Sequence, residues 1–277
     1  MKDVPDDVAL VEAVIPPAPR DYHGVNWAGF RTLYLREIRR FWKVGMQTLA
    51  APVVTALLYM MIFVVAVGAS RQPVPGIGFA TFVAPGLIMM SILNNAFANS
   101  SSSLLQAKMN GLIGDFLTPP LSPPEHVAAF ALGAATRGIV VGAVTWVSVL
   151  PFTGLPITHL WAVLYFGAGA SVILGLLGMM AGLWAEKFDH MAVVTNFIVM
   201  PMTFLSGTFY LVERLPEPFR TASHFNPFFY LIDGFRYGFI GHAEGSLFTG
   251  VGVTAGLVIM LTCLCLWMFE TGYKLKT

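Results

Sequence analysis

Charged residues are scarce in this chain. They make up only 11% of its 277 residues, whereas hydrophobic residues make up 56%. A soluble globular domain carries about 25% charged residues, which keep its surface hydrated. The shortage therefore excludes an ordinary water-exposed surface, and the mean hydropathy of +0.70 indicates that most of the surface faces lipid. The formal net charge is only +1, so nothing in the composition favours nucleic acid as a partner.

Cysteine is almost absent, and so are the motifs of metal and phosphate sites. Cys263 and Cys265 lie in one apolar run without metal-ligand companions, and two cysteines on one helix cannot staple a fold. None of the six lysines follows a glycine, so the chain lacks the G-x-x-x-x-G-K-[ST] loop that cradles nucleotide phosphates. We therefore expect no metal, no cofactor and no catalytic residue, and we expect any ATPase to be another polypeptide.

The apolar runs also lack the spaced acidic residues of a proton relay. They do not divide into matching halves, as the inverted repeats of many secondary transporters do. Both absences disfavour transport driven by an ion gradient. An intramembrane lipid-modifying enzyme would need acids or histidines converging at one depth, whereas the acids here lie in loops. That enzyme and a non-transporting membrane scaffold are the alternative functions.

Long hydrophobic runs are what the sequence has in quantity. Each of six runs is near the ~20 residues that cross ~30 Å of hydrocarbon. They lie at 48–68, 78–98, 128–150, 160–183, 191–211 and 248–269. The fifth is the weakest because Asn196, Pro201 and Thr203 interrupt it. The pattern predicts an all-α membrane protein with six transmembrane helices.

An irregular cytosolic tail at 1–26 precedes the membrane domain, which occupies 27–277. The tail has no short apolar core with a cleavage site, so the first run is predicted to be an uncleaved anchor. At 27–43, aromatic and apolar residues recur on one helical face and basic residues fall on the other. This pattern is typical of an amphipathic helix in the headgroup plane, and packing against protein is compatible with it.

Lysine and arginine in the loops predict the orientation. Eleven fall on the side of the two termini: Lys2, Arg20, Arg31, Arg36, Arg39, Arg40, Lys43, Lys108, Lys187, Lys274 and Lys276. Four fall on the other side: Arg71, Arg214, Arg220 and Arg236. We therefore expect a multi-pass protein of the plasma membrane (the bacterial inner membrane) with both termini cytoplasmic.

Two segments between runs are unusual. The loop at 99–127 contains a helix-compatible stretch at Leu104–Leu117, and the four prolines after it should stop that helix. The stretch at 212–247 is rich in aromatics, proline and glycine, and two short re-entrant or interfacial helices would fit it. Asn226 before Pro227 is suited to cap the second helix, on which Asp233 and Arg236 are close enough to pair. Either a movable lid or a static aromatic plug could result.

Two stretches carry a family resemblance. They read FVAPGLIMMSILNNAFANSSSSLLQAK at 82–108 and FLSGTFYLVERLPEPFRTASHFNPFFYLIDGFRYG at 204–238. The second is the more diagnostic, with Ser206-Gly207-Thr208, Leu215-Pro216, Asn226-Pro227, Asp233 and Arg236 in order. Both resemble the ABC-2 type permease family, whose members export drugs, polysaccharides or glycolipids. The similarity covers nearly the whole chain from about residue 25 onward.

The resemblance implies a division of labour. It implies two permease chains, expected to be a homodimer of this one, with two separate ATPase subunits in a lipid membrane. The 27–43 helix resembles the family's connecting helix, with Arg36, Glu37, Arg39 and Arg40. Coupling to the ATPase is expected from Lys108, Asp115, Phe116, Leu117, Glu186 and Asp189, and the outer gate from Asn226, Pro227, Asp233 and Arg236. The substrate is expected to be amphipathic, either a drug-like molecule or a lipid-linked glycan.

Polar residues within the runs are the cavity candidates. They are Asn95, Asn99, Asn196, Thr203 and Ser206. Arg137 is costly inside the third run unless it is paired or wet, so it either snorkels to the cytoplasmic interface or pairs inside the bundle. Small residues from Ser171 to Gly182 share one face of the fourth run. They serve either packing within the chain or a dimer seam.

Overall fold

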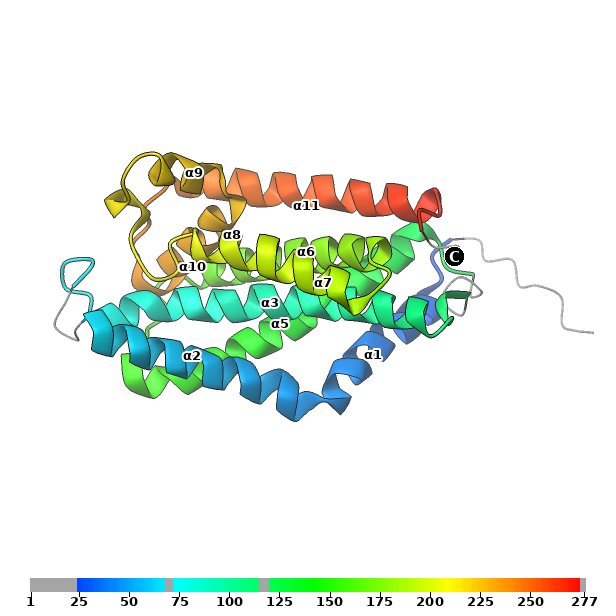
Figure 1. Ribbon diagram of the computed structural model, residues 1–277, viewed down its shortest axis with the longest axis horizontal. Coiled ribbons are helices and arrows are strands. Elements are labelled where there is room, and N and C mark those ends of the chain that lie inside the picture. Colours follow the sequence, from blue (N-terminus) through cyan, green and yellow to red (C-terminus); the bar gives the residue numbers. More distant parts are fainter. Residues whose placement is uncertain (1–23, 68–71, 115–119, 275–277) are drawn as a thin grey trace, which may run out of the picture.

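The computed structural model describes residues 24–67, 72–114 and 120–274, and these form a helical bundle with no β-strand among them (Figure 1). Five helices of this described part are long and apolar enough to cross a membrane. They are α2 (Gly45–Val67), α3 (Phe79–Met109), α5 (Pro123–Thr153), α6 (Leu160–Trp184) and α11 (Leu247–Glu270). The all-α membrane class is confirmed, and these helices coincide with five of the six predicted runs.

The centre of the bundle is α3. In the apolar window of α3, 83% of the residues are buried, compared with 11% in α2. It packs most extensively against α6 and α5. Glycines make this close approach possible, because a Cβ at Gly178 would lie 2.3 Å from the carbonyl oxygen of Phe97, and one at Gly182 would lie 2.9 Å from that of Ser101. The small-residue face of α6 therefore serves packing within one chain.

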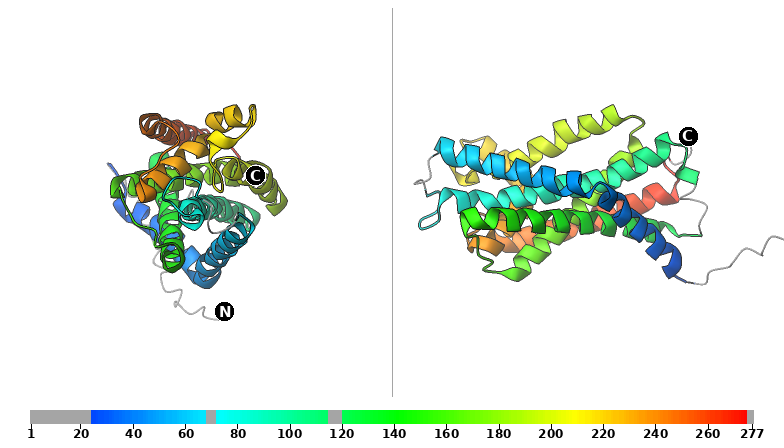
Figure 2. Two further views of the ribbon diagram at one scale, coloured as in Figure 1. Left: turned by 90° about the vertical axis from the view of Figure 1, so that its left-hand side faces the viewer. Right: turned by 90° about the horizontal axis from the view of Figure 1, so that it is seen from below.

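The amphipathic helix α1 (Trp27–Lys43) packs on α5 at one end of the bundle, and Figure 2 shows it running obliquely away from the long helices. Its buried residues are Leu33, Glu37 and Phe41, whereas Trp27 is exposed. Asn26 begins the helix by accepting a hydrogen bond from the Gly29 backbone N–H. Its own backbone N–H donates to the Glu125 carboxylate at the start of α5. The start of α1 is thus tied to the start of α5.

The predicted separate helix at Leu104–Leu117 is wrong in its first part. The helix α3 continues without a break to Met109, and the chain turns only at Asn110–Gly111. No helix breaker separates the polar residues from the apolar run. Ser102 donates to the carbonyl of Ala98 in its own helix, and Ser103 donates to Glu37 of α1. Asp115, Phe116 and Leu117 lie outside the described residues.

The predicted fifth run at 191–211 is helical over a different range. The helix α7 (Phe188–Val194) continues through a π-helical turn (Thr195–Val199) into α8 (Met200–Phe204). Proline lacks a backbone N–H, and Pro201 lies at the start of α8, directly after the turn that accommodates it. The chain then turns at Gly207, whose φ is +75°. The helical run therefore ends seven residues before the predicted boundary.

The stretch after α8 forms two short helices, as predicted: α9 (Phe219–Phe225) and α10 (Pro227–Ile240). Asn226 caps α10 by accepting a hydrogen bond from the Phe228 backbone N–H at 3.0 Å, which confirms the predicted helix cap. Figure 1 places α9 and α10 at the end of the bundle opposite α1, whereas the end of α11 lies near α1. The first and last described residues are therefore at the same end of the bundle.

Candidate functional site

A cavity of 640 Å³ lies along α3, and we call it the α3 cleft. Its lining comes from the end of α1, from α2, α3 and α5, and from Met200 of α8: Arg40, Val44, Gln47, Thr48, Ala51, Pro52, Thr55, Ala56, Tyr59, Leu87, Met90, Ser91, Asn94, Asn95, Ala98, Ser102, Gln106, Arg137 and Met200. A neighbouring cavity of 380 Å³ shares Asn94, Asn95 and Ser102 and is bounded by α7. One face of α3 is therefore hollowed between α2 and the α7–α8 run.

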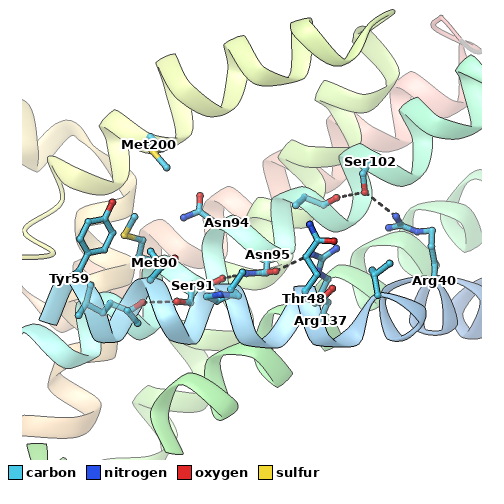
Figure 3. A pocket seen from close by; sticks show the side chains of 18 of the residues that line it. Arg40, Thr48, Tyr59, Met90, Ser91, Asn94, Asn95, Ser102, Arg137 and Met200 are labelled. Carbon is cyan, nitrogen blue, oxygen red and sulfur yellow. Dashed lines mark hydrogen bonds between the residues drawn. The ribbon is translucent and has the colours of Figure 1, made fainter. Parts of the chain in front are cut away.

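The two ends of the α3 cleft differ in polarity (Figure 3). At one end lie Tyr59, Met90 and Met200, and at the other lie Arg40, Thr48 and Arg137. The helix α3 lines the cleft from Leu87 to Gln106, which is about 28 Å at 1.5 Å per residue. An elongated, half-polar cavity of this kind suits a molecule with one polar and one apolar part.

An aromatic cluster lies beyond the apolar end. The ring of Phe209 stacks on Phe63 at 4.2 Å, and it packs at 5.4 Å against Phe204 and at 5.8 Å against Tyr59. These rings join α2 to the turn that follows α8. The apolar end of the α3 cleft is thus bounded by residues from 204–209.

The polar end is built by hydrogen bonds between α3 and α5. The Arg137 guanidinium donates to Asn95 Oδ1 at 3.0 Å. The amide of Asn95 is held by its own bond to Ser91 O, also at 3.0 Å. Arg137 thus has a partner inside the bundle, and that partner is an amide rather than a carboxylate.

Glu37 is the buried centre of a second network, behind the α3 cleft. Its side chain is fully buried and accepts a hydrogen bond from Ser103 Oγ at 2.7 Å. Arg40 lies 3.4 Å from the Glu37 carboxylate and donates to Ser102 Oγ at 3.0 Å and to the carbonyl of Asn99. A Cβ at position 133 would lie 2.8 Å from the Glu37 side chain, so Gly133 makes room for it. Glu37 and Arg40, predicted to belong to a connecting helix, therefore join α1 to the last third of α3.

At the opposite end of the bundle, the predicted Asp233–Arg236 ion pair is replaced by another. Arg236 lies 3.3 Å from Glu244, with both side chains almost completely buried, and its guanidinium is 4.2 Å from the centre of the Phe82 ring. Asp233 instead accepts hydrogen bonds from the backbone N–H groups of Glu244 and Gly245, each at 2.9 Å. Helical spacing allowed the predicted pair, but the turn after α10 brings in a second carboxylate. We call Asp233, Arg236 and Glu244 the outer ion cluster.

Burial dominates the titration of the outer ion cluster. It raises the pKa of Glu244 to about 7, although the Arg236 charge opposes that rise. Burial also raises the pKa of Asp233, against the opposing effect of its two backbone donors. Arg236 also donates to the carbonyl of Gly207, in the turn after α8. The cluster thus links α10 to the residues that bound the apolar end of the α3 cleft.

The predicted coupling residues that the structure describes lie at the α1 end. Lys108 donates its ammonium to the carbonyls of Leu183 and Ala185, where α6 ends. Glu186 is exposed and pairs with Lys274 at 2.9 Å, and this ammonium lowers the pKa of Glu186. Asp189 is exposed in the first turn of α7. Lys108 and Glu186 therefore each have a partner within the chain, and Glu186 and Asp189 are both exposed.

Of the predicted cavity residues, Asn95 alone lines the α3 cleft. Asn99 is fully buried beside Arg40, and Asn196 is exposed. Thr203 and Ser206 are buried and hydrogen-bonded within the chain, Ser206 accepting from Asn226 Nδ2 at 2.8 Å. The sequence had a signal for Arg137, its charge within an apolar run. It had none that placed Arg137 and Arg40 in the same cavity.

No metal site accompanies these clusters: the described ranges contain no group of three histidine, cysteine, aspartate or glutamate residues able to hold a metal ion. The side chains of the α3 cleft and of the clusters around it offer hydrogen bonds, charges and apolar contacts. Such groups can bind and orient a molecule.

The chain is similar to one protein family and to several individual proteins. A model of the ABC-2 type transporter family matches residues 28–240. The inner membrane transport permease YadH of Escherichia coli (strain K12) is 33% identical over 252 residues, covering 91% of this chain and 98% of that protein. Nodulation protein J of Rhizobium leguminosarum bv. viciae is 23% identical over 242 residues, covering 86% of this chain and 91% of that protein. Both similarities extend over most of the length of each protein.

Proposed function

Because the chain belongs to the ABC-2 type transporter family, we propose that it is the permease subunit of an ATP-binding-cassette exporter. It moves an amphipathic substrate, either a drug-like molecule or a lipid-linked glycan, across the membrane. The observation that carries this proposal is the α3 cleft, which is polar at one end, apolar at the other and set among helices of membrane-spanning length. A transporter family also favours transport over the enzyme and scaffold alternatives.

The ATPase is a separate subunit in this proposal, because the chain has no P-loop sequence. Two copies would act on two permease chains. Exposed Glu186 and Asp189 flank the start of α7, which lies at the same end of the bundle as the end of α3 (Figure 1), and this suits a docking surface for that subunit. Asp115, Phe116 and Leu117, which lie outside the described residues, remain the expected centre of the contact.

We expect the permease pair to be two copies of this chain. The helix α2 exposes large apolar side chains, among them Val54, Leu58 and Met61, and the α7–α8 run exposes Phe197 and Ile198. These two elements flank the α3 cleft. A second copy that packs against them would enclose the cleft and bury apolar surface at the same time.

In the membrane, we expect the α1 end of the bundle to face the cytoplasm. The relative named as an inner membrane permease supports the bacterial inner membrane as the location, and the loop charges support the orientation. Together with the α7–α8 run, the five long helices would make six crossings. The helices α9 and α10 would then form a re-entrant lid over the outer end, with a static plug as the alternative.

The test is isolation of the tagged permease from its native membranes, followed by reconstitution with the P-loop protein that accompanies it. We expect ATP-dependent movement of a substrate in proteoliposomes and ATPase activity that the substrate stimulates. Asp115→Ala and Phe116→Ala should abolish both activities and leave the complex inserted, whereas Glu217→Ala, at the opposite end, should preserve them. If no P-loop protein accompanies the permease and ATP moves nothing, the proposal is wrong.

A further inference from the structure

We infer that the α3 cleft binds amphiphiles with an anionic head group, which is held between Arg40 and Arg137 while the apolar part lies toward Tyr59 and Met200. As a statement about the transported substrate, this inference rests on the proposed function. As a statement about binding, it rests on the cleft alone.

The first argument is the charge of Arg137. Among the described residues, Arg137 forms no ion pair with any carboxylate, and its one hydrogen bond to another side chain goes to the neutral amide of Asn95. Its Nε is buried and has no hydrogen-bond partner. An arginine side chain has five N–H donors, and Arg137 lines the α3 cleft, so a ligand there could supply hydrogen-bond acceptors and the opposite charge.

The depth of Arg137 strengthens this argument. It lies fourteen residues after Pro123 and sixteen before Thr153, close to the middle of α5. A charged side chain at such depth is expensive in a membrane, and such residues commonly mark substrate pathways. An anionic ligand would offset the cost by supplying the opposite charge. A cationic ligand would increase it.

Arg40 adds a second positive charge at the same end of the α3 cleft. Among the described residues, the carboxylate paired with Arg40 is that of Glu37, which lies 3.4 Å away and is completely buried behind the cleft. Arg40 and Arg137 both line the cavity, and no aspartate or glutamate is among its described lining residues. Guanidinium groups bind carboxylate and phosphate oxygens with good geometry. The polar end therefore selects for a negative head group.

The opposite end selects for an apolar tail. Neutral hydrogen-bonding groups lie between the two ends, where Asn94 and Asn95 project from α3 (Figure 3). Beyond them, Leu87, Met90 and Met200 provide apolar and flexible contacts, and thioether side chains adapt to varied apolar shapes. A free inorganic anion would leave this half of the cleft unused. The arrangement therefore fits an amphiphile rather than a small ion.

The experiment measures binding by the permease alone in a nonionic detergent, with isothermal titration calorimetry. Its three probes are dodecyl phosphate, dodecyltrimethylammonium and inorganic phosphate. We expect dodecyl phosphate to bind at least tenfold more tightly than either of the others. Equal affinity for the two dodecyl compounds would refute charge selection, and equal affinity for inorganic phosphate would refute the role of the apolar end. This comparison needs no variant.

Variants then locate the site. Arg137→Gln removes one charged hydrogen-bond donor, so it should weaken dodecyl phosphate binding about tenfold, while Arg137→Lys should keep most of the preference for the anion. Arg220→Gln, an exposed arginine on α9, is the matched control and should bind as the unmodified protein does. Unchanged affinity in a monodisperse Arg137→Gln protein would overturn the assignment. If that variant does not fold, Arg137→Lys is compared with the control, and reversed charge preference would overturn it.

Failure of this inference and failure of the proposed function give different results. The binding measurement uses no ATPase and no ATP. Anion-selective binding without ATP-dependent movement would refute the exporter and leave the inferred site intact. ATP-dependent movement of a neutral or cationic molecule, unaffected by Arg137→Gln, would refute the inferred site and leave the exporter intact.

Discussion

Gly178 offers a direct test of the packing that forms the α3 cleft. It lies on α6 where this helix crosses α3, and a Cβ added there would be 2.3 Å from the carbonyl oxygen of Phe97, whereas ordinary contact begins at 3.4 Å. The obstructing atom belongs to the backbone of a central helix, so it cannot rotate away. Gly178→Ala must therefore push α6 from α3 or strain both helices.

The expected cost follows from two opposing effects. Overpacking a well-packed core costs about 1–3 kcal/mol, and the rigid neighbour places this site at the upper part of that range. Alanine recovers up to ~1 kcal/mol through its better helix propensity. Gly252→Ala on α11 is the matched control, because a Cβ there has nothing within 4 Å, so only the propensity gain applies.

A third variant separates backbone from side-chain obstruction. A Cβ at Gly142 would lie 2.5 Å from the Ile92 side chain. Both residues border an apolar cavity of 310 Å³, into which this side chain can move. Gly142→Ala should therefore cost less than Gly178→Ala. The order of stability should be Gly252→Ala, then Gly142→Ala, then Gly178→Ala.

Thermal unfolding of the purified variants, followed by tryptophan fluorescence in a nonionic detergent, checks this order. One kcal/mol shifts Tm by about 2–4 °C in a protein of this approximate size, so Gly178→Ala and Gly252→Ala should differ by roughly 5–10 °C. Phe97 is two residues from Asn95, so the same displacement should disturb the Arg137–Asn95 contact and reduce transport. Equal Tm values for Gly178→Ala and Gly252→Ala would refute the close-packing argument.

Three further predictions concern the ends of the bundle. Reporter fusions at Thr277 should report the cytoplasm and fusions at Ser223 the far side, and the reverse result would overturn the orientation. Thr208 and Phe229 are both buried, so cysteines placed there should react poorly with a membrane-impermeant thiol reagent at rest. They should react faster when the ATPase is trapped with ATP. Equal labelling in both states would leave only a static plug. Glu244 has a pKa raised from 4.5 to about 7, so the folded state binds its proton more tightly, and stability should fall as pH rises through this window. Glu244→Gln should flatten that part of the Tm-versus-pH curve, and an unchanged slope would show that Glu244 does not titrate there.

The sequence alone determined the class of the protein and much of its organisation. Scarce charge and long apolar runs are properties of single segments, so they predict membrane-length helices without knowledge of any neighbour. The same holds for the Asn226 cap, which depends only on adjacent residues. The predicted helix boundary was wrong where polar residues continue a helix. The predicted break after residue 98 failed because Ser100, Ser101 and Ser103 are buried within the bundle although they are polar.

Only the tertiary structure decided which residues meet. Arg40, Asn95 and Arg137 come from α1, α3 and α5, and the cleft that they share depends on how each helix is rotated about its axis. Rotation is set by contacts between helices, such as the approach of Gly178 to the Phe97 carbonyl. The same reason explains why Arg236 does not pair with Asp233, its predicted partner on the same helix. Arg236 pairs instead with Glu244, which lies in the loop after α10. Hydropathy and helical spacing describe one segment at a time, whereas a binding site is formed by side chains that several segments bring together.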